Sequence, residues 1–183
     1  MATQDTAVQQ RPGQRRYVYG GYKGKGNPSE REKILHLLDE YRCTEGFVAE
    51  YLPKWIEVSP HEGLKGGLHM IQQREAAHAR VMAARLRALG EVPRATIPAE
   101  RREREIPFFG SAERSDVEKL QVLANLFGDP NEFLKPVTDL IEQIQEDQQS
   151  KELLRAIMDD ERASIKWLVE MYQTLSATKA AAQ

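Results

Sequence analysis

Residues 91 to 112, EVPRATIPAERREREIPFFGSA, form the stretch on which the fold of this chain depends. The stretch contains three prolines, four acidic residues and four basic residues, and its apolar residues do not recur at helical spacing. We therefore predict a connection of about 22 residues without regular structure. Connections of this length are uncommon inside a compact domain and usually serve a purpose. The segments on either side indicate what that purpose is.

Two long helices are predicted before the connection. Ser29 followed three residues later by Glu32 is typical of a capping box, so we expect the first helix to begin there and to end before Pro60. The second helix is expected over about residues 61 to 89, with Gly90 at its C-terminal end. Both segments carry apolar residues at intervals of three and four. They should pair as an antiparallel hairpin.

Two more helices are predicted after the connection. The third covers about residues 115 to 127, is broken near Gly128-Pro130, and restarts with Asp129 as its N-cap and apolar spacing up to residue 147. The fourth covers about residues 150 to 175. No strand pattern is present, so the expected class is all-α. Two antiparallel hairpins joined by one long crossover make a four-helix bundle, with Phe108 and Phe109 as anchors of the crossover.

Composition limits the class of protein further. The chain has 183 residues, 40% of them hydrophobic, and a formal charge of -2, which fits one domain with no overall preference for nucleic acid or anionic membranes. Cys43 is the single cysteine, so no internal disulfide can form and a reducing compartment, the cytoplasm, is expected. No apolar run approaches the roughly 18 residues of a membrane span, and the N-terminus lacks the apolar stretch of a signal peptide.

The two ends of the chain differ from its body. Residues 1–28 contain five basic residues and one acidic residue without a periodic apolar face, and we expect a flexible basic tail. Residues 29–177 should form the helical bundle, and residues 178–183 a C-terminal tail. The basic tail is the only feature that suggests nucleic acid, and we do not expect nucleic-acid binding.

Four polar side chains fall on the apolar faces of the predicted helices. Glu45 lies on the face of the first helix, Glu75 and His78 on that of the second, and Glu161 on that of the last. Glu45 and Glu75 are each 15 residues from Pro60, so they should lie at the same height in the hairpin. Carboxylates buried at one level repel each other unless a cation or a basic partner is present. A metal ion is one solution, and the other is a buried ion pair with an inward arginine, namely Arg42, Arg80 or Arg85.

The sequences REAAH at 74–78 and DDERASIKWL at 159–168 resemble the Glu-x-x-His helices of the ferritin-like superfamily, in the style of rubrerythrin and bacterioferritin. That family binds two irons with one Glu from each of two helices and one Glu-x-x-His from each of the other two. The resemblance implies that Glu45 is the first Glu, that Glu75 and His78 form the first motif, and that Glu161 belongs to the second. It further implies iron or manganese, oxygen- or peroxide-linked iron oxidation, and a homodimer or larger homo-oligomer.

The chain departs from the family pattern at two places. Ser164 occupies the position of the second histidine, and a hydroxyl is a poor iron ligand. No fourth carboxylate falls clearly on the face of the third helix, and Glu132 is the best candidate because the break before it changes the helical phase. Three outcomes remain open: an altered dinuclear site, a single-metal site, or a metal-free helical interaction or structural protein with a degenerate site.

Overall fold

A computed structural model describes the backbone of residues 28–181 and the side chains of residues 28–178. Within this range the chain forms helices and no strand, so the all-α prediction is confirmed. Of the predicted basic tail, residues 1–27 lie outside the described part of the chain. The helices are α1 (Glu30–Val58), α2 (Glu62–Ala88), α3 (Ala99–Gly110), α4 (Asp116–Phe127), α5 (Pro130–Glu142) and α6 (Gln148–Ala181).

The hairpin of α1 and α2 has the predicted ends. Ser29 Oγ accepts a hydrogen bond from the Glu32 backbone N–H at 3.2 Å, and the Glu32 carboxylate accepts one from the Ser29 N–H at 2.8 Å. This reciprocal pair is the expected capping box, and it satisfies two of the N–H groups that a helix start leaves free. After α2 the chain turns at Gly90, whose φ of 81° favours glycine.

The third predicted helix is broken where expected, into α4 and α5. Gly128 has a φ of 57°, and the Asp129 carboxylate caps α5 by accepting the N–H groups of Asn131 and Glu132 at 2.9 and 3.1 Å. The predicted continuation of this helix to residue 147 is wrong, since α5 ends at Glu142. The following turn is held from outside its own sequence, because the Glu30 carboxylate accepts hydrogen bonds from the backbone N–H groups of residues 145–147.

Two other predicted boundaries also need correction. Helix α6 extends to Ala181, beyond the expected end near residue 175 and into the predicted C-terminal tail. The connection of residues 91–112 contains the helix α3, which apolar spacing does not indicate. This helix is stabilised by the pairing of Arg101 with Glu105, 3.2 Å apart at i,i+4, and by one buried aromatic residue.

That aromatic residue is Phe109, one of the two predicted anchors. Its ring lies 4.5 Å from that of Tyr51 and 5.3 Å from that of Trp55, centroid to centroid, and the side chain is buried. Phe108 is only partly buried and packs at the edge of the same apolar cluster. The crossover is therefore fixed to α1 at its far end.

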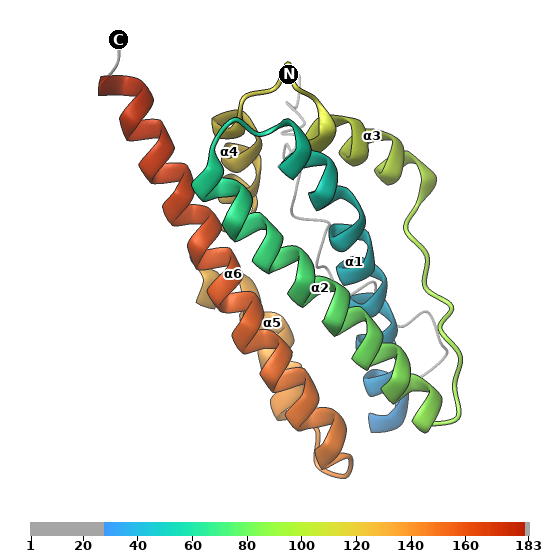
Figure 1. Ribbon diagram of the computed structural model, residues 1–183. Coiled ribbons are helices and arrows are strands. Elements are labelled where there is room, and N and C mark those ends of the chain that lie inside the picture. Colours follow the sequence, from blue (N-terminus) through green and yellow to red (C-terminus); the bar gives the residue numbers. More distant parts are fainter. Residues whose placement is uncertain (1–27, 182–183) are drawn as a thin grey trace, which may run out of the picture.

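The helices pack in two units that meet along α2 and α6 (Figure 1). Helices α1 and α2 form the hairpin, while α4 and α5 each pack against α6. The core consists of two apolar clusters, one near each end of the long helices. One cluster joins α1, α2, α5 and α6, and the other joins α1, α2, α3, α4 and α6. Along α1 and α2 the boundary between the clusters falls at the polar positions 45 and 75 to 78, and along α6 the two clusters meet at residues 165 to 168.

Across the described residues, no helix combines the length and the apolar character that crossing a bilayer requires.

Candidate metal centre

Four of the five predicted ligands come together between the two apolar clusters. Glu45 of α1 and Glu75 and His78 of α2 are buried, and Glu161 of α6 has a side chain that is 14% exposed. Glu75 and His78 are one helical turn apart and therefore share a face of α2. We call Glu45, Glu75, His78 and Glu161 together the layer. The two apolar clusters lie on either side of it and keep water away, so its charges interact strongly.

Three ligand atoms converge here without hydrogen-bond partners. His78 Nδ1 lies 3.6 Å from Glu161 Oε1 and 3.9 Å from Glu45 Oε2. Each of these atoms is buried, and among the described residues none of the three has a hydrogen-bond partner. One nitrogen and two carboxylate oxygens lie within 4.8 Å of one another. Buried polar atoms are nearly always satisfied, so this convergence is typical of a cation-binding site or of groups that share protons.

The imidazole of His78 is oriented by a residue that lies outside the predicted set. Asp160 Oδ2 is 3.1 Å from His78 Nε2. A carboxylate in this position favours the tautomer in which Nε2 carries the proton and donates it, which leaves the Nδ1 lone pair directed at Glu45 and Glu161. Metal-binding histidines are commonly held in this way, with the ring nitrogen that does not bind the ion donating to a carboxylate.

Burial and mutual repulsion favour the protonated form of the buried carboxyl groups. Burial raises the pKa of Glu45 well above its ordinary value of 4.5, and the Glu161 carboxylate adds to the shift. Burial also raises the pKa of Glu75 well above 4.5, as do the charges of Glu45 and Glu161. Burial lowers the pKa of His78, but its interactions with Glu161 and Asp160 outweigh this and leave that pKa above 6.5. A bound cation would reverse the shifts of the carboxyl groups.

A small cavity adjoins the cluster. It has a volume of about 40 Å³ and is lined by Glu45, Glu75, Glu161 and Ser164, together with Tyr51 and apolar residues. About 10 to 15 Å³ of such volume is enough for one water-sized group. The carboxylates therefore border a space in which an ion or a small ligand fits without displacing the core.

The remaining predicted positions are not part of a second metal position. Glu132 is exposed in the first turn of α5, where it complements the helix dipole, so it is not brought to the cluster. The phase of α5 is set by its cap at Asp129 and by its packing on α6, and these direct Glu132 to solvent. Ser164 is buried and accepts a long hydrogen bond of 3.4 Å from Arg74 Nη1, which brings a positive charge to the position of the missing histidine.

The arginines considered as inward partners are engaged elsewhere or exposed. Arg42 pairs with Asp39 at 2.7 Å, and Arg85 pairs with Asp147 at 2.7 Å. Arg80 is exposed on α2. Within residues 28–178, therefore, none of these three arginines neutralises Glu45 or Glu75.

A buried carboxylate outside the cluster was not found by sequence reasoning. Asp116, at the start of α4, accepts hydrogen bonds from Trp55 Nε1 at 2.7 Å and from Ser59 Oγ at 2.6 Å, and lies 2.6 Å from His61 Nδ1. Its burial raises its pKa, but the bonds from Ser59, His61 and Trp55 outweigh this and hold the pKa below 3.8. Its partners lie more than 50 residues away, so no local pattern could have indicated this structural link between α4 and the first hairpin.

The fold and the site together define an all-helical protein with a buried layer of three glutamates and a histidine. No protein-family model, no curated protein and no solved structure matches this chain. The assignment of function therefore rests on the chemistry of the cluster.

Proposed function

We propose that this chain is a ferritin-like helical-bundle protein that binds a transition-metal ion, iron or manganese, inside the bundle. The ligands are Glu45, Glu75, His78 and Glu161. The observation that supports the proposal best is the convergence of Glu45 Oε2, His78 Nδ1 and Glu161 Oε1, all buried and without partners.

The donor set favours these metals. Carboxylates combined with an imidazole suit iron and manganese, whereas no set of cysteine ligands of the kind found in structural zinc sites is available. Ser164 and the exposed Glu132 leave a second ion without its usual donors, which favours one ion per chain over two. An ion with this incomplete protein ligand set would keep positions open toward the adjoining cavity.

The residues around the ligands would each support the site in a definite way. Asp160 holds the tautomer of His78 in which Nδ1 is the free donor. The apolar clusters limit the access of water. When iron is bound, the chemistry implied by the family resemblance is oxidation of the ferrous ion by oxygen or peroxide. Assembly into a homodimer or a larger homo-oligomer stays a prediction of the same resemblance.

A metal-free structural or interaction protein is the second candidate. It is favoured by the Arg74 guanidinium beside Ser164 and by carboxyl groups whose raised pKa values allow them to share protons. In that case the layer would be a degenerate metal site. The two candidates differ in one measurable property, which is the affinity of the purified protein for a divalent ion.

Titration with Mn(II), followed by the electron paramagnetic resonance of the free ion, tests the proposal. We expect saturable binding of one ion per chain, a loss of at least tenfold in affinity for Glu161→Gln, and wild-type affinity for Asp159→Asn. Asp159 lies on the same helix, but it is exposed and paired with Arg162, which makes it a matched control. Anaerobic Fe(II) should compete with Mn(II), and admission of air should then produce visible absorbance.

The absence of saturable binding by both Mn(II) and anaerobic Fe(II) would reject the metal proposal and leave the metal-free candidate. Equal weakening by Glu161→Gln and Asp159→Asn would also reject it, because the ion would then be held by general surface charge.

A further inference from the structure

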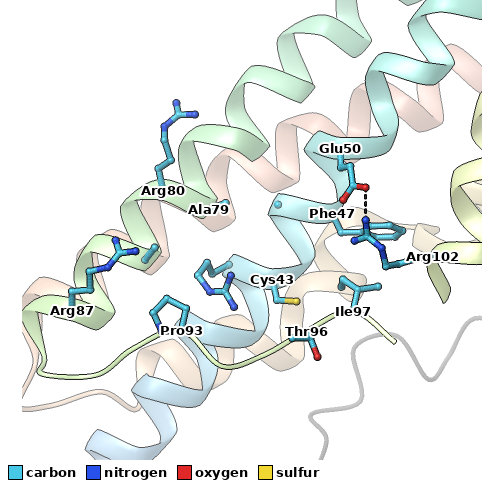
Figure 2. A pocket seen from close by; sticks show the side chains of 13 residues that line it. Cys43, Phe47, Glu50, Ala79, Arg80, Arg87, Pro93, Thr96, Ile97 and Arg102 are labelled. Atoms are coloured by element: carbon cyan, nitrogen blue, oxygen red, sulfur yellow. Dashed lines mark hydrogen bonds and ion pairs between the residues drawn. The ribbon is translucent and has the colours of Figure 1, made fainter. Parts of the chain in front are cut away.

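A large cleft among the described residues lies apart from the candidate metal centre. It has a volume of about 720 Å³ and is formed by α1, α2 and the extended part of the crossover, with one residue from α3 (Figure 2). The crossover lies on one side of the α1 and α2 hairpin, and α6 lies on the other side (Figure 1). The cleft and the buried glutamates are therefore separate sites.

The wall that the crossover contributes is held in place by hydrogen bonds. Asp39 Oδ2 accepts the backbone N–H groups of Arg94 and Ala95 at 2.8 and 2.7 Å, and Arg42 Nη2 donates to the Ala95 carbonyl at 2.8 Å. At the other end of the cleft, Arg102 of α3 pairs with Glu50 of α1. Fixed at both ends, the crossover does not collapse onto the helices.

The space between this wall and the helices remains open because the helices present small side chains there. Gly46 of α1 and Ala79 and Ala83 of α2 line the cleft. A Cβ placed on Gly46 would be 3.8 Å from the Cβ of Ala79, so the two helices are in close contact at this point. Larger residues at these positions would fill the cleft.

The cleft is strongly cationic. Four arginines and one glutamate are among its lining residues. Arg42 and Arg102 are paired with acidic residues, but Arg80 and Arg87 have neither an ion pair nor a side-chain hydrogen bond within the described part of the chain. Both leave α2 at the rim of the cleft and are exposed (Figure 2). They are seven residues apart in sequence, which corresponds to about two helical turns or about 10 Å along the helix axis. Long exposed side chains of this kind can close over a bound anion.

We infer that this cleft binds a small organic oxyanion, a molecule that carries phosphate or carboxylate groups, through Arg80 and Arg87. A guanidinium matches the geometry of both groups by donating two parallel hydrogen bonds. The volume lies within the range of about 300 to 1,000 Å³ typical of small-molecule sites. Phe47, Pro93 and Ile97 offer apolar contacts for the carbon part of the ligand. The distance between the two arginines favours a ligand with acidic groups at both ends.

The chain carries its own reporter for occupancy of this cleft. Cys43 lines the cleft, is partly exposed, and is the only cysteine of the sequence. Burial raises the pKa of its thiol, so the reaction with an alkylating reagent is slow enough to follow. A ligand bound in the cleft should slow the reaction further by covering the sulfur. An uncharged maleimide is the suitable reagent, because the arginines do not attract it.

The experiment titrates the full chain with tripolyphosphate and, separately, with suberate, an extended dicarboxylate, by calorimetry and by the alkylation rate of Cys43. We expect one of the two probes to bind with a stoichiometry of one and to slow alkylation at least threefold. Preference for tripolyphosphate would indicate a phosphorylated ligand, and preference for suberate a carboxylic acid. Arg80→Gln combined with Arg87→Gln should weaken binding at least tenfold.

The control is a double variant with the same change in net charge, Lys135→Gln combined with Lys166→Gln. Both lysines are exposed, on α5 and α6, and they are not among the residues of the cleft. The inference is overturned if neither probe binds at millimolar concentration, or if the two double variants weaken binding equally. Because Mn(II) binding is measured separately, failure here leaves the proposed metal function unaffected.

Discussion

Replacing Glu75 by Gln distinguishes a metal-binding layer from a metal-free one by the sign of a stability change. Glu75 is 3% exposed and lies against Glu45 and Glu161. Glutamine has nearly the same shape but carries no charge and needs no proton. In metal-free protein at pH 7 the variant should be more stable, since each unit by which burial raises the pKa of Glu75 corresponds to about 1.4 kcal/mol. We expect a gain of about 1 to 3 kcal/mol, which corresponds to a shift of roughly one or two pKa units.

The metal-loaded protein should respond in the opposite direction. An ion at a hundredfold excess over its Kd stabilises the folded chain by about 2.7 kcal/mol, and the variant loses much of this because it lacks one ligand. For a protein of this size, about 1 kcal/mol changes Tm by about 2 to 4 °C. Chelator should therefore lower the Tm of the wild type by several degrees and leave the Tm of Glu75→Gln nearly unchanged.

Differential scanning fluorimetry at pH 7, with EDTA and with Mn(II), measures all four values. Glu40→Gln, at an exposed position of α1 outside the cluster, serves as the control for loss of one acidic charge. The reasoning is refuted if Glu75→Gln is destabilised in EDTA, because the layer would then require the ionised carboxylate. Equal Tm values of the wild type in EDTA and in Mn(II) would refute the metal part alone.

Further predictions concern pH, the missing histidine and helix packing. The folded pKa of Asp116 lies below 3.8, so the stabilisation that its carboxylate provides is present above that pH and is lost as pH falls toward the folded pKa. Asp116→Asn should lower the free energy of unfolding by about 2 kcal/mol near neutral pH. It should also make the midpoint of urea denaturation less dependent on pH in the acid range. Ser164→His restores the histidine that the family pattern has at this position and this chain lacks. It should tighten Mn(II) binding about tenfold, or about 1.4 kcal/mol, in a competition titration. Unchanged binding would show that this position faces no ion. A Cβ on Gly67 would lie 1.9 Å from the Trp167 ring, so Gly67→Ala should lower stability by about 1 to 2 kcal/mol in thermal melts. A Cβ on Gly66 would have no neighbour within 4 Å, so the control variant Gly66→Ala should raise stability by about 0.5 to 1 kcal/mol.

Several helix ends are determined by the local sequence. The local signals are the pair of Ser29 and Glu32, Gly90, and Gly128 followed by Asp129. Each acts on the backbone within four residues, so its effect does not depend on the rest of the fold. The site layer could be predicted for a similar reason. Two helices joined by a short turn must bring residues at equal distances from it to the same height, and this fixes Glu45 beside the pair on α2.

Other features were decided only by the tertiary structure. Helix α3 depends on burial of Phe109 against α1, and the turn after α5 is held by Glu30, more than 100 residues away. The exposure of Glu132 follows from the packing of α5 after a break, across which the helical phase cannot be carried. Asp160 became the partner of His78 only when α6 packed on α2. Contacts between distant segments depend on how helices rotate and pack, and a residue's sequence neighbours do not contain that information.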